Sequence, residues 1–248
     1  MRRSTLIPVL AAAFLASVLW ANRPNPQPEH ARGLDAKEID FVLEVLLGLE
    51  NSIHHYPVTR WAKPASVTIR AGGAKFRNDV EEVISEINQT LAGTNMSLKL
   101  IQGEADIIIE GRPLGMLWKT KDAYKCEAWG ADFGFVCPTL DKSSGAMLKA
   151  VIGVAENLPG KRTRSVVLEE LVQALGPQND VPHYPDSLFF ESDEHPLNWE
   201  KTLSPRDQRL LRFLYLHLKP GDNEARVREM IETHWKSLSA LPGGPSPE

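Results

Sequence analysis

The segment Ala105–Gly111, with the sequence ADIIIEG, constrains the fold most, because it holds three successive isoleucines. β-branched side chains favour extended backbone, and a run this short is more typical of a strand than of a helix. The run is apolar enough for the centre of a sheet, so we expect flanking strands and covering helices elsewhere in the chain.

Other segments supply those elements. Apolar residues at helical spacing predict helices at 34–50, 76–93, 165–175, 203–218 and 222–235. Short apolar or alternating runs predict strands at 64–72, 96–101, 133–138 and 147–155. A long irregular loop follows the third helix. Ser204 and Asp207, around Pro205, have the spacing of a helix N-cap. The order predicts one α+β domain with a small mixed sheet, a long helix and C-terminal helices.

The N-terminus has a different composition. Two arginines precede an apolar run from Leu6 to Trp20, which is typical of an export signal and short for a membrane-spanning helix. We therefore interpret residues 1–21 as a signal peptide or an N-terminal anchor, 22–33 as a Pro-rich linker, 34–238 as a single domain and 239–248 as a flexible tail. The protein is expected to be exported, periplasmic or extracellular, and to contact a membrane only if the leader is retained.

Charge and cysteine content narrow the class of protein. The net charge of −4 and the 42% hydrophobic content indicate a globular domain and argue against a nucleic-acid partner. Cys126 and Cys137 are the two cysteines. In an exported chain such a pair predicts a disulfide, and two buried thiols are the alternative.

The predicted helix at 165–175 and the loop after it carry a pattern of polar residues around one glycine. The stretch LEELVQALGPQND places these residues at Glu169, Glu170, Gln173, Gly176, Asn179 and Asp180. Positions 169, 170 and 173 share one helix face by the i, i+3, i+4 rule, so we expect them to point together toward the loop.

This pattern resembles the extended zinc motif of the metzincin branch of the zincin metallopeptidases, H-E-x-x-H-x-x-G-x-x-H. More closely, it resembles an uncharacterised family of bacterial exported domains that carries E-E-x-x-Q-x-x-G-x-x-N-D at this place. The resemblance covers roughly residues 35 to 220. It implies a zincin-like fold in which the helix at 165–175 is a former active-site helix, and it implies no particular reaction.

The chemistry of the motif argues against zinc. Peptidases of this type bind zinc through two histidines on the helix and use the glutamate between them as a general base. Here Glu170 alone survives, as a candidate remnant, while Glu169 and Gln173 replace the histidines. We expect no metal and no cofactor. Two alternatives stay open: Ca²⁺ on the oxygens of the motif, and zinc held by histidines outside the helix, such as His183, His195 or the pair at 54–55.

These observations lead to a functional prediction. Glu170 and Gln173 are expected to hydrogen-bond the backbone of the loop from Asn179 to Ser187, since buried polar groups need partners. The chain would then be a non-catalytic binding or scaffolding domain for an unknown protein partner or ligand. The alternative is a metallopeptidase-like hydrolase with a non-standard metal site.

Overall fold

The computed structural model describes residues 35–48, 56–126, 133–191 and 202–238. The predicted leader, linker and tail lie outside these ranges, as do the histidines at 54, 55 and 195. Within the described ranges, no helix combines the length and the apolarity that crossing a bilayer requires.

The central strand prediction is confirmed. The strands are β1 (Ala65–Ala71), β2 (Leu98–Leu100), β3 (Ile107–Arg112), β4 (Gly134–Leu140) and β5 (Met147–Ala155). They form one sheet in the order β2-β1-β3-β5-β4, with the isoleucine strand in the middle and all three isoleucines fully buried. The pairs β1–β2, β1–β3 and β3–β5 are parallel, and β4 is antiparallel to β5. The sheet is therefore mixed, as predicted.

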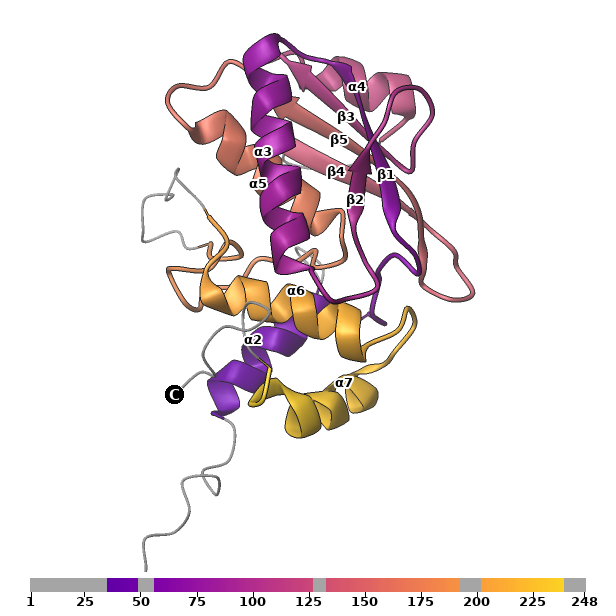
Figure 1. The fold of residues 1–248 in the computed structure, drawn as a ribbon, viewed down its shortest axis with the longest axis vertical. Helices are drawn as coiled ribbons and strands as arrows, with labels where there is room; N and C mark the ends of the chain where they lie inside the picture. The colour runs from indigo at the N-terminus through magenta and orange to yellow at the C-terminus, as the bar shows by residue number, and fades with distance from the viewer. Residues whose placement is uncertain (1–34, 49–55, 127–132, 192–201, 239–248) are drawn as a thin grey trace, which may run out of the picture. The chain divides into compact units, whose positions relative to one another are not determined.

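Helices pack on the sheet and beyond one end of it. They are α2 (Ala36–Leu47), α3 (Ala74–Thr90), α4 (Leu117–Tyr124), α5 (Arg162–Gln173), α6 (Pro205–His217) and α7 (Glu224–Met230), which continues as the π-helical turn η2 (Ile231–Trp235). The helices α3 and α5 contact each other on one face of the sheet, and α5 contacts both β4 and β5 (Figure 1). In turn, α6 contacts α3 and η2, while α2 contacts α7. This arrangement confirms the predicted α+β class.

Two apolar cores result. One lies between the sheet and the pair α3 and α5, whose buried side chains are mostly valine, leucine and isoleucine. The other joins α2, α6 and η2 through aromatic side chains. There the rings of Phe213 and Trp235 meet edge to face with their centroids 5.4 Å apart, and Phe41 is fully buried. The helix α5 is thus buried along most of its length, which fixes the direction of its polar side chains.

Two local predictions are also confirmed. The Ser204 hydroxyl accepts a hydrogen bond from the backbone of Asp207, whose carboxylate accepts one from the backbone of Ser204, so α6 begins with a capping box and has Pro205 at its first turn. Cys126 and Cys137 form a disulfide that joins the end of α4 to β4.

Candidate functional site

The end of α5 is fixed by side chains from distant parts of the chain. The carbonyl groups at the C-terminal end of a helix have no hydrogen-bond partner within the helix and need one from elsewhere. Here three successive carbonyls each accept a side-chain hydrogen bond: Ala174 from Trp61 (2.8 Å), Leu175 from Tyr215 (2.6 Å) and Gly176 from Thr59 (3.3 Å). The position at which the loop leaves α5 is therefore rigidly defined.

Gly176, the glycine of the motif, is required by this packing. Its φ is +142°, a conformation that L side chains rarely adopt, and a Cβ on it would lie 2.4 Å from the carbonyl oxygen of Thr59. The conformation and the close approach each exclude a side chain, so a structural reason accounts for the glycine.

Glu170 points toward the sheet. Its side chain is buried, and a Cβ added to Gly134 of β4 would lie only 2.4 Å from its Oε1 atom. Glu169 and Gln173 are half-buried. The buried carboxylate of the motif thus packs against β4, the strand that ends the sheet on this side.

Asn179 lies apart from Glu170, at the end of α2. Its Nδ2 atom donates a hydrogen bond to the carbonyl oxygen of Glu44 (3.2 Å), and a Cβ on Gly48 would lie 2.6 Å from the same nitrogen. Asp180 beside it is half-buried. The motif therefore divides, with Glu170 facing the sheet and Asn179 packed on α2.

The carboxylate that holds the loop is Asp207 of α6. Its oxygens accept hydrogen bonds from the Ser187 hydroxyl (2.6 Å) and the Leu188 amide (2.9 Å), in addition to those of the capping box. Burial of this fully enclosed carboxyl raises its pKa above the ordinary value, although the hydrogen bonds from Ser187, Leu188 and Ser204 oppose the shift. Sequence reasoning found Asp207 as a cap residue and missed its contact with the loop.

The loop also closes on itself and packs on neighbouring helices. Its two arms meet in a bridge between Val181 and Phe190. Tyr184 lies between the ring of Phe41, with centroids 5.3 Å apart, and the guanidinium of Arg206, which is 3.5 Å from the tyrosine centroid. The described loop, residues 174–191, has no helix or strand and is thus packed by its own side chains.

The donors of the motif do not fit a zinc site of the zincin type. Position 173 is an amide where that chemistry needs an imidazole, and the side-chain nitrogen of Asn179 is bound to α2. His183 places its Nε2 atom 3.6 Å from an oxygen of Glu44, also on α2. In the described parts of the chain, no three His, Cys, Asp or Glu side chains are grouped so that they could hold a metal ion.

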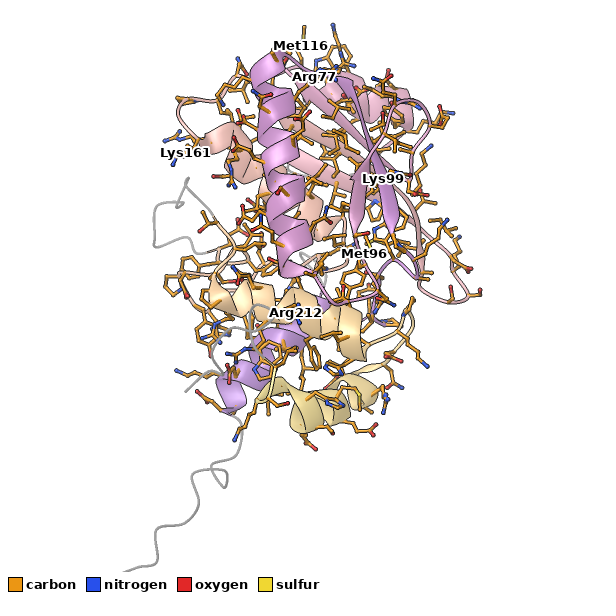
Figure 2. The ribbon with its side chains drawn as sticks, viewed as in Figure 1. Arg77, Met96, Lys99, Met116, Lys161 and Arg212 are labelled. Carbon is orange, nitrogen blue, oxygen red and sulfur yellow. A yellow bond between two sulfur atoms is a disulfide. The ribbon has the colours of Figure 1, made fainter. Side chains whose placement is uncertain are left out.

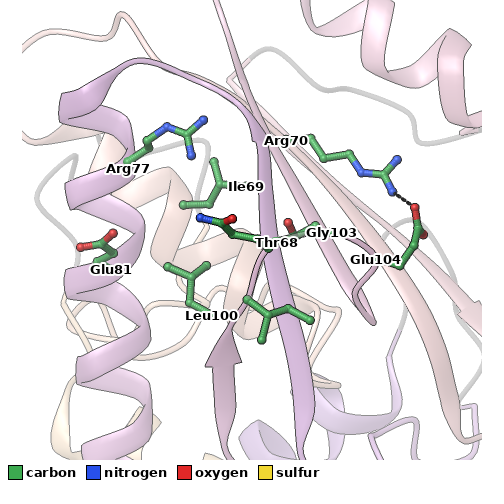
Figure 3. A pocket seen from close by; sticks show the side chains of 10 residues that line it. Thr68, Ile69, Arg70, Arg77, Glu81, Leu100, Gly103 and Glu104 are labelled. Carbon is green, nitrogen blue, oxygen red and sulfur yellow. Dashed lines mark hydrogen bonds and ion pairs between the residues drawn. The ribbon is translucent and has the colours of Figure 1, made fainter.

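A cavity of about 810 Å³ opens at the edge of the sheet opposite β4, between α3 and the short strand β2. Figure 3 shows Arg77 and Glu81 of α3 on one wall and the ion pair of Arg70 with Glu104 (2.6 Å) on the other. Ile69 of β1 lies between them. None of the residues singled out from the sequence lines this cavity, so it is separate from the motif on α5.

Comparison with known proteins gives a family and distant structural neighbours. Residues 36–233 match a family described as "Protein of unknown function (DUF2927)". No curated protein matches the chain. Two solved structures of myroilysin are similar at 11% identity. One has a TM-score of 0.40 and covers 63% of this chain and 95% of its own; the other has a TM-score of 0.39 and covers 74% and 97%.

Proposed function

The chain belongs to the DUF2927 family, whose function is unknown, and on this premise we propose that it is an exported binding domain without catalytic activity. In this proposal the domain is a zincin-like scaffold that has lost its zinc ligands. Its former active-site helix, α5, now has a structural role, and its ligand is an unidentified protein or small molecule outside the cytoplasm.

The placement of Asn179 supports the proposal most directly. In the metzincin motif this position supplies the third zinc ligand. Here the side chain is bound to the backbone at the end of α2, 3.2 Å from the Glu44 carbonyl oxygen. Glu170 packs against Gly134, and Gly176 packs against Thr59. The position of the third zinc ligand is thus bound to α2, and the general-base position, Glu170, packs against β4.

Export is supported by the disulfide and by the leader. Disulfides persist in oxidising compartments and are rare in the cytosol, and Cys126 is bonded to Cys137. The apolar run from Leu6 to Trp20 follows two arginines. We expect N-terminal sequencing of the exported protein to start near Asn22. Full-length protein that resists alkaline extraction of membranes would show instead that the leader is a retained anchor.

Metal content and hydrolysis test the absence of catalysis. The protein, purified from medium supplemented with zinc and calcium, should hold well below one equivalent of either metal. It should release no peptide from labelled casein above a buffer blank. A Glu170→Gln variant, which keeps the shape of the side chain, is the matched control and should behave in the same way.

Another result would support the alternative function. The oxygens of Glu169, Glu170, Gln173 and Asp180 are donors that a hard cation accepts. The wild type would then hold one equivalent of metal and hydrolyse peptide, and Glu170→Gln would lose both properties. This result would show that the protein is a hydrolase with a non-standard metal site and not a binding domain.

A further inference from the structure

A rigid turn between β3 and α4 exposes apolar side chains to solvent. The amide of Met116 donates to the carbonyl of Pro113 (2.9 Å), and the amide of Leu114 donates to the side chain of Asn157 (2.7 Å). No atom lies within 4 Å of the position that a Cβ on Gly115 would take. The turn is therefore fixed at its base and surrounded by open space at its tip.

The apolar exposure at this tip is large and local. The exposed fractions are 48% for Leu114, 38% for Met116 and 57% for Trp118 at the start of α4. Single exposed apolar residues are ordinary on a protein surface, whereas a cluster marks a site of interaction. Three large apolar side chains within five residues form such a cluster, which we call the apolar tip.

Basic residues follow the parallel strands at the end of the sheet that carries the apolar tip. The strands β1, β3 and β5 are parallel, so the segments that follow their carboxyl ends share one end of the sheet. Figure 2 shows Arg77, which follows β1, close to Met116 in the view. The exposed basic residues on these segments are Lys75, Arg77, Lys119, Lys125 and Lys161, of which Lys161 lies well away from Met116 in Figure 2.

The acidic residues on the same segments balance part of this charge. An oxygen of Glu156 accepts a hydrogen bond from the amide of Gly73 (2.6 Å) at the start of α3, and this neutral donor leaves the charge of the carboxylate in place. Asp79 forms an ion pair with Lys75 (2.8 Å), so that pair is neutral. Asp122 on α4 is a further exposed carboxylate, as are Glu81 and Glu82 on α3, and Glu81 lines the same cavity wall as Arg77. The positive excess beside the apolar tip therefore lies on α4 and directly after it, where Lys119 and Lys125 outnumber Asp122, although the whole chain is negative.

We propose that this end of the sheet docks on the surface of an anionic lipid bilayer. Leu114, Met116 and Trp118 enter the interfacial region, and Lys119 and Lys125 contact the headgroups. Tryptophan favours this region because its ring is apolar and its N–H is polar, and lysines near an anionic surface strengthen binding. A narrow protruding tip suits a deformable lipid surface, whereas a stable protein interface needs a broader patch. The proposal concerns residues remote in sequence from α5 and does not depend on catalysis.

Quenching of tryptophan fluorescence by brominated lipids tests this directly. The exported protein and its Trp118→Phe variant are mixed with brominated phosphatidylglycerol vesicles or with brominated phosphatidylcholine vesicles. The difference in quenching between the two proteins reports Trp118 alone and cancels every other tryptophan, including Trp20 of the leader. We expect this difference to be roughly threefold larger on the anionic vesicles.

Charge reversal supplies the second part of the test. Lys119→Glu combined with Lys125→Glu should weaken binding to phosphatidylglycerol vesicles at least about thirtyfold. Lys99→Glu is the matched control, since Lys99 is exposed on β2 and lies away from Met116 (Figure 2), and it should bind like the wild type. Absent quenching of Trp118, equal quenching on both lipids or an unaffected double variant would each overturn the proposal. Shielding of Trp118 from acrylamide by a protein of the same compartment, without lipid quenching, would assign the tip to a protein partner.

Discussion

At the scale of single residues, the carboxylate of Glu170 lies so close to β4 that no side chain fits at position 134. A Cβ there would lie 2.4 Å from both Glu170 Oε1 and Val166 Cγ1. Gly134→Ala should lower the free energy of unfolding by about 1–3 kcal/mol, as overpacking does. Glu170→Ala should relieve part of this cost, so the two substitutions should be non-additive in a double-mutant cycle measured by urea unfolding.

Glu170→Gln is the control for that cycle. Because glutamine keeps the shape of glutamate, Gly134→Ala should be as costly in the Gln background as in the wild type. Strictly additive effects of Gly134→Ala and Glu170→Ala would show that the carboxylate does not occupy the space in front of β4.

Asp207 makes a residue-scale prediction about pH. Burial raises the pKa of its carboxyl in the folded state, so the folded state binds a proton more tightly than the unfolded state. Stability from this group is then present at low pH and is lost as the pH rises through the raised pKa. The stability of the wild type minus that of Asp207→Asn should therefore fall with rising pH across the acidic range, as measured by urea midpoints. A difference that grows with pH would mean that the hydrogen bonds from Ser187, Leu188 and Ser204 outweigh burial.

At the scale of elements, the end of α5 depends on side-chain donors from other segments. Tyr215→Phe removes the hydroxyl that donates to the Leu175 carbonyl and leaves a buried acceptor unpaired, which costs about 1–3 kcal/mol. The same change should speed amide hydrogen exchange in residues 176–181. Tyr56→Phe, on an exposed tyrosine, should change stability by less than about 0.5 kcal/mol. Equal effects of the two variants would contradict the role of the Tyr215 hydroxyl.

Most helices and strands could be predicted from the sequence, because their apolar residues recur with the period of a helix or a strand and these residues are buried in the structure. The sequence does not predict the helix α4, since only Leu117 and Thr120 are buried in it and they form no apolar stripe. The order of the strands in the sheet could not be predicted from the sequence either, because it depends on contacts between distant segments.

The candidate site could be predicted only in part, for a similar reason. The residues of the motif and their shared helix face follow from spacing. Their partners do not, because Gly134, Glu44 and Thr59 come from elements with no local relation to α5. The contact between Asp207 and the loop joins residues about 20 positions apart. The capping pattern already gave Asp207 a local role, so the sequence offered no reason to expect a second one.

At the scale of the whole molecule, the disulfide restrains the chain between α4 and β4. It closes a loop with a sequence separation of 11 residues, for which the chain-entropy model gives about 3 kcal/mol. Replacing Cys126 and Cys137 together by serine should lower the free energy of unfolding by about that amount. Urea unfolding of the double variant, beside wild type with and without reductant, is the measurement. A variant as stable as the oxidised wild type would show that the bond does not restrain the unfolded chain.

Two buried arginines join the sheet layer to the C-terminal helices. Arg60, before β1, donates from one guanidinium nitrogen to the carbonyls of Leu214 (2.8 Å) and Leu218 (2.6 Å) at the end of α6. Arg212 of α6 donates in the opposite direction, to carbonyls at the end of α3, and Figure 2 shows it where α6 passes α3. Each places a cation at the carbonyl end of a helix in the other layer, where the helix dipole favours it.

Arg60 should therefore control how the C-terminal helices are attached. Arg60→Met leaves the carbonyls of Leu214 and Leu218 unpaired, at about 1–3 kcal/mol each. Arg60→Lys keeps a charge but not the planar fork, so its effect should be intermediate. Native-state hydrogen exchange should show amides of α6 and α7 opening at lower free energy in Arg60→Met, while those of β3 follow global unfolding alone. Arg226→Met, at an exposed pair with Glu229, is the control and should leave both patterns unchanged. If α6 and β3 lose protection equally in Arg60→Met, the two layers unfold as one unit and Arg60 is an ordinary part of a single core.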